Sequence, residues 1–262
     1  MNDNDLTFIS AENTFDFLCE RLKNKIPTNF YRLGDGELLS AHGIKDSSQH
    51  SNVIDKIKYK QELIDLISLN KDNILFGLPY HSKKYGYSKN MNSKMHLWND
   101  GYAQSMVERF LKLNKNNKTI YSSVWNAHNS VWNTEKFLYY LKLIRNDYSL
   151  FVGGENNNDI TIKKLFNVSS IIKTPIKNSY NEIDKIEEIC LSKLNNNFNI
   201  LILSCGCCSK ILQYRISSKI NNVYFLDIGS FMEIFKDKSK WSWVKKIDNK
   251  HKNKIISTLL GN

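Results

Sequence analysis

Two carboxylates that stand two residues apart, Asp35 and Glu37, are the side chains of this chain best suited to chemistry. They follow a strand-like run, and side chains at i and i+2 of an extended backbone point the same way. Gly34 and Gly36 beside them permit a sharp turn and the close approach of a ligand. Paired carboxylates of this kind are typical ligands of a hard divalent cation. The segment therefore predicts a metal and diphosphate site.

A second block places small residues after a buried run, at Gly206, Cys207, Cys208 and Ser209, where a helical pattern begins. Small residues there let backbone N–H groups at a helix start approach a phosphate. A plain strand-to-helix connection explains the same local sequence equally well. The cysteines have no second pair elsewhere in the chain, which favours small buried side chains over a zinc site.

Two further strand ends carry acids. A loop with Glu155, Asn158 and Asp159 follows two glycines and could bind a base or a ribose, or could simply cap a helix. Asp227 ends another apolar run, with Ser230 close behind it, and suits a hydroxyl group, a cation or a turn cap.

Apolar runs of strand length alternate with stretches of helical spacing along most of the chain. The strand-like runs are 29–33, 73–76, 119–121, 149–152, 169–172, 200–204 and 223–226, and the clearest helical patterns are 54–67, 106–113 and 183–194. Alternation of this kind predicts an α/β fold, Rossmann-like, with a mostly parallel sheet flanked by helices on both faces. Ligands in such folds bind beyond the carboxyl ends of the strands, which is where the acids and glycines stand.

The composition indicates a soluble protein of ordinary size. With 262 residues, 41% hydrophobic, and only 3 prolines, a single domain over residues 1–262 is expected, with a core at about 28–235. The polar start, the absence of a long apolar run and the odd count of 5 cysteines predict a cytoplasmic protein. The net charge of +11 suits nucleic acid, an anionic membrane surface or an anionic substrate. Because the lysines are scattered, nucleic acid is not the expected partner.

The block Arg32 to Glu37 resembles the R-x-G-D-G-E motif of the GT-D fold glycosyltransferases, the DUF1792 group. Later blocks resemble the same family in the same order: Gly154-Glu155 with Asn158-Asp159-Ile160, then Thr174 to Tyr180, then Leu201 to Leu212, then Leu226 to Gly229. Two departures stand out, because Cys207-Cys208-Ser209 replaces a usual P-T-A and Ser230 stands where the family commonly has His. Any chemistry done by that His is absent from this chain.

The resemblance implies a glycosyltransferase that depends on Mn²⁺ or Mg²⁺ and uses a nucleotide sugar, most readily a UDP-sugar. Asp35 and Glu37 would be the catalytic, metal-holding pair. The implied nucleotide-sugar residues are Arg32, Gly34, Gly36, Glu155, Asn158, Asp159, Gly206, Cys207, Cys208, Ser209, Asp227 and Ser230. A glycan, a glycopeptide or a lipid-linked acceptor in bacterial surface glycan or glycoprotein biosynthesis would receive the sugar.

Two other functions fit the same residues. A nucleotidyl or phosphoryl transferase uses paired acids and a metal in the same way, and a basic module could bind nucleic acid or another surface without catalysis. The C-terminal extension 236–262 mixes lysines with Trp241 and Trp243. It predicts an amphipathic helix that buries both tryptophans, or else a contact with an anionic membrane at the inner face.

Overall fold

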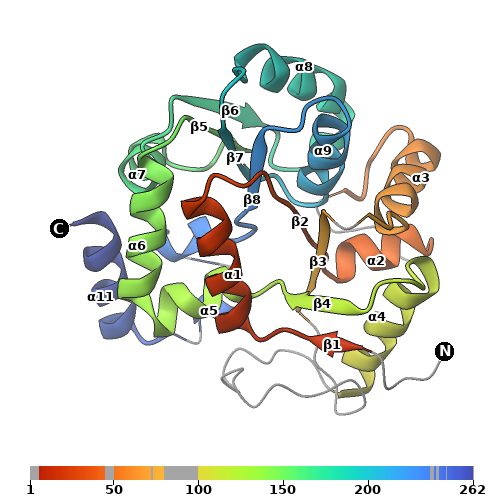
Figure 1. Cartoon of the computed structure of the whole chain (residues 1–262), viewed down its shortest axis with the longest axis horizontal. Helices are drawn as coiled ribbons and strands as arrows, with labels where there is room; N and C mark the ends of the chain where they lie inside the picture. Colours follow the sequence, from red (N-terminus) through yellow and green to blue (C-terminus); the bar gives the residue numbers. More distant parts are fainter. Residues whose placement is uncertain are drawn as a thin grey trace.

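The protein is seen in a computed structural model, which describes residues 6–44, 50–71, 73–79, 100–236, 239, 242–245 and 247–261. In this part of the chain two parallel four-stranded sheets form, in the orders β1-β4-β3-β2 and β6-β5-β7-β8 (Figure 1). The strands are β1 (Thr7–Phe8), β2 (Asn29–Arg32), β3 (Ile74–Leu78), β4 (Thr119–Ser122), β5 (Ser149–Gly154), β6 (Ser170–Thr174), β7 (Asn199–Ser204) and β8 (Val223–Asp227). The predicted α/β fold and its seven strands are confirmed. Only the two-residue β1 had no detectable pattern, because it is too short to show one.

The two sheets meet at β2 and β8. An isolated parallel bridge joins Thr28 to Tyr224, with Thr28 N donating to Val223 O at 3.1 Å and Phe225 N donating to Thr28 O at 3.1 Å. This contact, called the β2–β8 seam below, brings the carboxyl ends of β2 and β8 next to each other. A place where two sheet halves meet is where ligands of α/β folds commonly bind.

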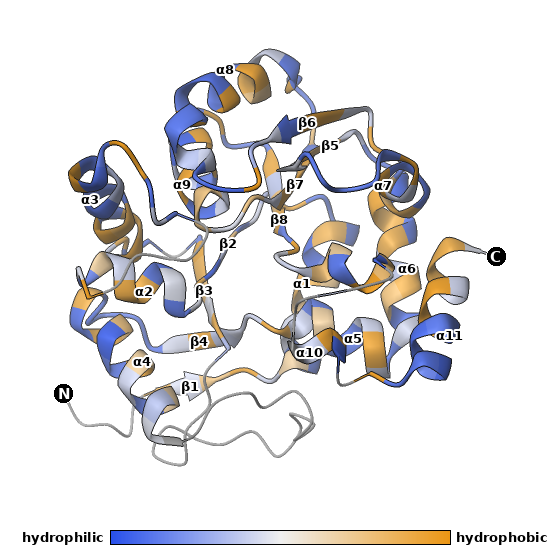
Figure 2. Ribbon diagram, turned by 180° about the vertical axis from the view of Figure 1, so that it is seen from behind, coloured by the Kyte–Doolittle hydropathy of each residue, from blue (hydrophilic) through white to orange (hydrophobic). Residues whose placement is uncertain are grey.

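One face of the sheets is covered by α2 (Asp35–Ala41), α3 (Lys56–Ile67), α4 (Asp100–Leu113), α8 (Ile183–Lys193) and α9 (Cys207–Ser217). Their apolar stripes form one core cluster with strand residues such as Leu150, Val152 and Leu203. Figure 2 shows strands such as β3 and β8 largely orange, while the surrounding helices are orange on one side and blue on the other. Burial on both faces explains why the strands are continuous apolar runs rather than alternating ones.

The opposite face is covered by α1 (Ala11–Lys23), α5 (Trp125–Trp132), α6 (Thr134–Arg145), α7 (Asp159–Phe166) and α11 (Asn249–Leu260). A second core cluster lies here and includes Phe15, Tyr140 and Tyr224. The hydroxyl groups of Tyr140 and Tyr224 lie 3.0 Å apart, and Tyr224 Oη also donates to Leu18 O at 3.0 Å. Helices α1 and α6, which precede β5 in the chain, thus pack on β8.

The C-terminal stretch is not the single helix predicted for it. After two short 3₁₀ helices elsewhere, η3 (Ser179–Glu182) and η4 (Phe231–Phe235), the chain forms α10 (Ser242–Lys245) and then α11. Asp248 separates the two helices because its side chain accepts from His251 N at 2.9 Å and caps α11. Trp243 is buried as expected, whereas Trp241 lies outside the described residues.

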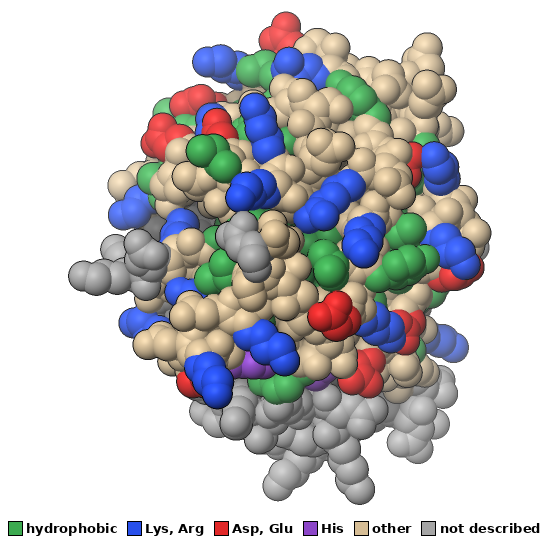
Figure 3. Space-filling view, turned by 90° about the vertical axis from the view of Figure 1, so that its left-hand side faces the viewer, with side chains coloured by type: hydrophobic (Ala, Val, Ile, Leu, Met, Phe, Trp, Pro, Cys, Tyr) green, Lys and Arg blue, Asp and Glu red, His purple; other side chains and the backbone are tan. Residues whose placement is uncertain are grey.

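The surface charge is spread out rather than gathered. Figure 3 shows lysine and arginine side chains over one whole face, interrupted by acids and by uncharged atoms. Within the described residues, the model contains no helix with the length and apolar character needed to cross a membrane.

Candidate active site

Asp35 and Glu37 lie in the first turn of a helix, not on extended backbone. Strand β2 ends at Arg32, and α2 begins at Asp35 with Gly34 as its N-cap. Successive helical side chains diverge by about 100°, so the two carboxylates point to different partners. The prediction that the side chains of Asp35 and Glu37 point the same way is therefore wrong.

Glu37 turns back onto the start of its own helix. Its Oε2 accepts from Gly34 N at 2.8 Å, which satisfies one of the N–H groups left unpaired at a helix start. Asp35 is only half-buried, and its Oδ1 accepts from Gly36 N at 3.0 Å and its Oδ2 from Tyr102 Oη at 3.4 Å. Asp35 is therefore closer to the surface than Glu37, which is buried.

The partner of Glu37 is Lys210, a residue that was not predicted to belong to the site. Lys210 Nζ lies 3.0 Å from Glu37 Oε1 and 2.8 Å from Asp227 Oδ2, and it donates to Gly206 O at 3.2 Å. The side chains of Lys210 and Glu37 are each 8% exposed, and that of Asp227 is 1% exposed. One buried ammonium thus joins the carboxyl ends of β2, β7 and β8.

Each charge in this cluster stabilises the others. Burial lowers the pKa of Lys210, but the carboxylates of Asp227 and Glu37 outweigh it and raise that pKa above its ordinary value. Burial likewise raises the pKa of Glu37, yet the Lys210 ammonium and the backbone N–H groups bring it below the ordinary value of 4.5. At neutral pH Lys210 is therefore a cation and Glu37 an anion.

Arg32 adds a second cation beside the seam. Its Nε donates to Ser123 O at 2.6 Å, and its Nη1 donates to Asp227 O at 3.2 Å and lies 3.4 Å from Asp227 Oδ1. Asp227 Oδ1 also accepts from Gly229 N at 2.8 Å. The structure thus brings three predicted site residues together, Arg32, Glu37 and Asp227. Lys210 lies among them.

The small-residue turn lies where it was predicted, at the start of α9. Gly206 is the N-cap and has φ 66° and ψ −140°, a backbone conformation that is open almost only to glycine. Cys207, Cys208 and Ser209 form the first helical turn and are buried. Ser209 Oγ accepts from Cys205 N at 3.0 Å, which fixes the turn from inside.

The remaining predicted residues have local roles in the described structure. Asn158 caps α7, because its side chain accepts from Thr161 N at 2.9 Å, and Asp159 forms an ion pair with Lys173. Glu155 is exposed at the carboxyl end of β5. Ser230 Oγ accepts from Trp243 Nε1 at 2.9 Å, so it holds the C-terminal extension. No described hydrogen bond or ion pair connects these residues to Glu37, Lys210 or Asp227.

A buried histidine lies beside the cluster and was also missed. His50 is 1% exposed, stacks on Tyr59 with ring centroids 5.6 Å apart, and has Nε2 3.4 Å from Ser179 Oγ. Burial, opposed by Glu37 and aided by Lys210, lowers the pKa of His50 to about 4. His50 is therefore neutral at physiological pH.

The predicted metal pair can be judged from these contacts. Both oxygens of Glu37 are engaged, one by Lys210 and the other by Gly34 N, so Glu37 does not fit a metal shared with Asp35. Among the described residues no cluster of three or more His, Cys, Asp or Glu side chains could hold a metal ion. Asp35 is half-buried and is the more accessible of the two carboxylates.

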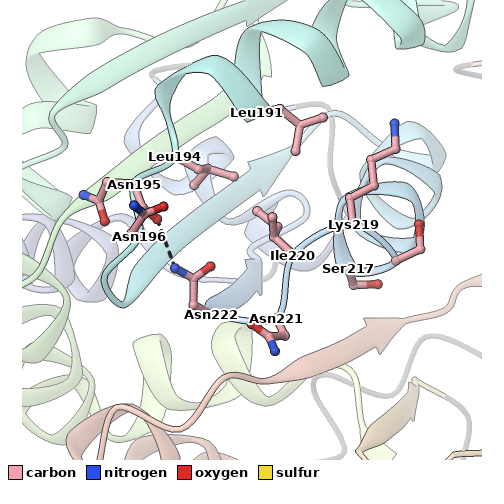
Figure 4. Close-up of a pocket in the computed structure, with 10 residues that line it drawn as sticks. Leu191, Leu194, Asn195, Asn196, Ser217, Lys219, Ile220, Asn221 and Asn222 are labelled. Atoms are coloured by element: carbon pink, nitrogen blue, oxygen red, sulfur yellow. Dashed lines mark hydrogen bonds between the residues drawn. The ribbon is translucent and has the colours of Figure 1, made fainter.

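A pocket elsewhere in the protein is separate from this site. It is lined by Leu191, Leu194, Asn195, Asn196 and residues 217–222, between the ends of α8 and α9 and the starts of β7 and β8 (Figure 4). Asn222 Nδ2 donates to Asn195 O at 3.0 Å across it. The pocket is at the amino ends of the strands and so opposite the Glu37, Lys210 and Asp227 cluster.

The fold resembles solved glycosyltransferase structures. A glycosyltransferase of the DUF1792 group from Streptococcus sanguinis is 18% identical, with a TM-score of 0.64 over 87% of this chain and 82% of that chain. A second structure, described as the domain of unknown function 1792 with a distinct glycosyltransferase fold, is 18% identical, with a TM-score of 0.62 over 88% of this chain and 80% of the other. At this identity the likeness shows the fold. No curated protein sequence matches the chain.

A match to a family model identifies the family of the chain, which the likeness in fold does not do by itself. The model for the glycosyltransferase GT-D fold matches residues 30–255, which span the whole Glu37, Lys210 and Asp227 cluster and most of the chain. The blocks predicted from the sequence fall inside this match. The chain belongs to the GT-D fold glycosyltransferase family and is a glycosyltransferase.

Proposed function

We propose that this glycosyltransferase moves a sugar from a nucleotide diphosphate donor, preferentially a UDP-sugar, to a glycan, glycopeptide or lipid-linked acceptor. The observation that carries the proposal is the charged cluster at the β2–β8 seam. Arg32 and the N-terminus of α9 lie where β2, β7 and β8 end, and Lys210 there offsets the charge of Glu37 and Asp227. An anionic diphosphate is the part of a nucleotide sugar that such a place attracts.

The described residues have distinct tasks in this proposal. The amino end of α9, which starts at Cys207, would face the phosphate oxygens, because the N-terminus of a helix attracts anions. Arg32 is fixed by Ser123 O and Asp227 O, so its guanidinium is preorganised toward the charge that grows on the departing diphosphate. Asp35, half-buried at the rim, faces the donor from the opposite side of the seam.

The requirement for Mn²⁺ or Mg²⁺ stays a prediction from the family resemblance. Such an ion supplies Lewis-acid neutralisation of the leaving diphosphate. Asp35, the more accessible of the two carboxylates, is the described residue that would bind it, together with oxygens of the donor itself.

The acceptor and the location are also part of the proposal. A role in bacterial surface glycan or glycoprotein biosynthesis, in the cytoplasm or at the inner face of the membrane, agrees with the exposed lysines. Anionic lipid would attract those lysines peripherally.

A panel of nucleotide sugars tests the donor. Full-length protein is incubated with UDP-, GDP- and dTDP-sugars, with EDTA or with Mn²⁺, and the products are separated by ion-exchange chromatography. Release of UDP from a UDP-sugar is expected. Release of pyrophosphate would instead indicate nucleotidyl transfer, and salt-sensitive binding of nucleic acid without turnover would indicate a binding module.

A further inference from the structure

Lys210 is surrounded by groups of the protein itself. In the described structure its Nζ donates to Gly206 O at 3.2 Å and forms ion pairs with Glu37 Oε1 at 3.0 Å and Asp227 Oδ2 at 2.8 Å. The side chain is also 8% exposed. Lys210 therefore acts on its neighbours within the protein rather than directly on the donor.

The two carboxylates are equally committed. Glu37 Oε2 accepts from Gly34 N, while Asp227 Oδ1 accepts from Gly229 N and lies 3.4 Å from Arg32 Nη1. Each carboxylate thus uses one oxygen for Lys210 and the other for the backbone of its own turn. The ammonium fixes the β2–α2 turn and the turn after β8 at once.

A divalent ion on Glu37 would conflict with this arrangement. Metal–oxygen bonds to a carboxylate are about 2.1 Å long, and Lys210 Nζ already lies 3.0 Å from Oε1. The two cations would come within about 5 Å of each other in a buried site, where like charges repel strongly. Glu37 can bind a metal only if Lys210 leaves.

We propose that Lys210 is the resident cation of the site and occupies the place between Glu37 and Asp227 that a divalent ion would otherwise need. Glu37 and Asp227 are then counter-ions of Lys210, not metal ligands. Lys210 is a positioning residue, because it holds Asp227 against Arg32 and holds the Gly34 and Gly206 turns in place. This proposal rests on the proposed function in one respect only, which is that the ligand of the site is a nucleotide diphosphate.

Manganese binding to the protein without nucleotide tests the role of Glu37. Full-length protein is stripped with EDTA, dialysed and titrated with Mn²⁺, and free Mn²⁺ is measured by electron paramagnetic resonance. Glu37→Gln is expected to bind Mn²⁺ as the unmodified protein does, within about twofold. Loss of a true ligand or of its support weakens metal binding about 10-fold or more, and a loss of that size in Glu37→Gln would overturn the proposal.

Removal of the ammonium provides the reciprocal test. Lys210→Met keeps the length of the side chain but frees two buried carboxylates, so Mn²⁺ affinity should rise about 10-fold or more. Lys210→Arg should return it to the original value. Lys136→Met is the matched control, because Lys136 pairs with Asp16 on the surface, with side chains 46% and 52% exposed. A folded Lys210→Met protein with no gain in affinity contradicts the proposal, and if that variant does not fold, Glu37→Gln decides.

Binding of UDP separates this proposal from the proposed function. By calorimetry, Glu37→Gln is expected to bind UDP within about threefold of the affinity of the unmodified protein, both with Mn²⁺ and in EDTA. UDP binding that requires Mn²⁺ and disappears in Glu37→Gln would overturn the role of Lys210. Failure to bind UDP under both conditions would refute the proposed donor. The two manganese titrations would still test whether Lys210 takes the place of a metal ion.

Discussion

The guanidinium of Arg32 fills the space that a side chain at Gly229 would need. A Cβ added at Gly229 would lie 2.3 Å from Arg32 Nη1, and the backbone there has φ +52°. The turn after β8 therefore requires glycine at position 229, because the guanidinium of Arg32 from the end of β2 lies against it.

Gly229→Ala should both destabilise the protein and displace Arg32. The positive φ alone costs about 1–3 kcal/mol for a residue with a side chain, and the clash adds to this. For a chain of this size each kcal/mol lowers Tm by roughly 2–4 °C. Gly261→Ala is the control, since Gly261 has φ +69° but nothing within 4 Å of the added Cβ. Equal Tm losses in the two variants would show that Arg32 is not held by Gly229.

Asp227→Asn should cost much more stability than the loss of a surface carboxylate. Asp227 is 1% exposed on its side chain and shares Lys210 with Glu37. Breaking a buried charge pair typically costs about 3–5 kcal/mol. Asp16→Asn, which breaks the surface pair with Lys136, should cost less than about 1 kcal/mol. Urea unfolding followed by circular dichroism compares them, and similar losses would show that the buried cluster does not stabilise the fold.

Acid should destabilise the protein through His50. Because burial lowers the folded pKa of His50 to about 4, below its ordinary value of 6.5, protons bind the unfolded chain more readily. The stabilising contribution is complete above pH 6.5 and is lost as the pH falls toward 4. The loss amounts to at most about 1.4 kcal/mol per pH unit.

The variant that checks this is His50→Phe, which keeps a ring stacked on Tyr59 but does not titrate. Urea unfolding is measured at several values between about pH 7 and pH 5, a window chosen to stay above the ordinary pKa of carboxylates. The free energy of unfolding of the original protein should fall relative to His50→Phe as the pH decreases. A constant difference would mean that His50 is not buried in its neutral form.

Gly206→Ala should weaken UDP binding about 10-fold. A residue with a Cβ is strained at φ 66° and ψ −140°, so the backbone would shift and the N–H groups of α9 would turn away from the phosphate. Gly43→Ala is matched to it, since Gly43 also has φ +66° and its nearest side-chain neighbour is the flexible end of Lys60. Both variants should lose stability, but only Gly206→Ala should lose affinity in calorimetry. Unchanged affinity in Gly206→Ala would remove the turn from the donor site.

Much of the fold could be predicted because buried parallel strands are unbroken apolar runs. The runs ending at Ser204 and Leu226 led directly to β7 and β8, and the glycine turn after β7 was placed at the start of α9. The backbone at Asp35 could not be predicted in the same way. A D-x-E pair after a strand suits either an extended turn or a helix start, and the hydrogen bond from Gly34 N to Glu37 decides for the helix.

Lys210 was missed because a lysine in a helix usually lies in solvent. Its neighbours gave the only local signal, since nearly every residue from Cys207 to Gln213 is small or apolar and all of them are buried. A lone cation in such a run predicts a buried partner, but not which one. Glu37 lies more than 170 positions earlier in the chain, and only the seam brings it near.

The opposite charges of the site come from two parts of the chain that meet at the seam. Residues before 147 supply Arg32, Asp35 and Glu37, and residues after it supply Lys210 and Asp227. Without the second half Glu37 would lack its cation, and without the first half Asp227 would be left alone with Lys210. Helices α1 and α6 pack across the same boundary, so the contacts that join the two parts of the chain also bring these opposite charges together.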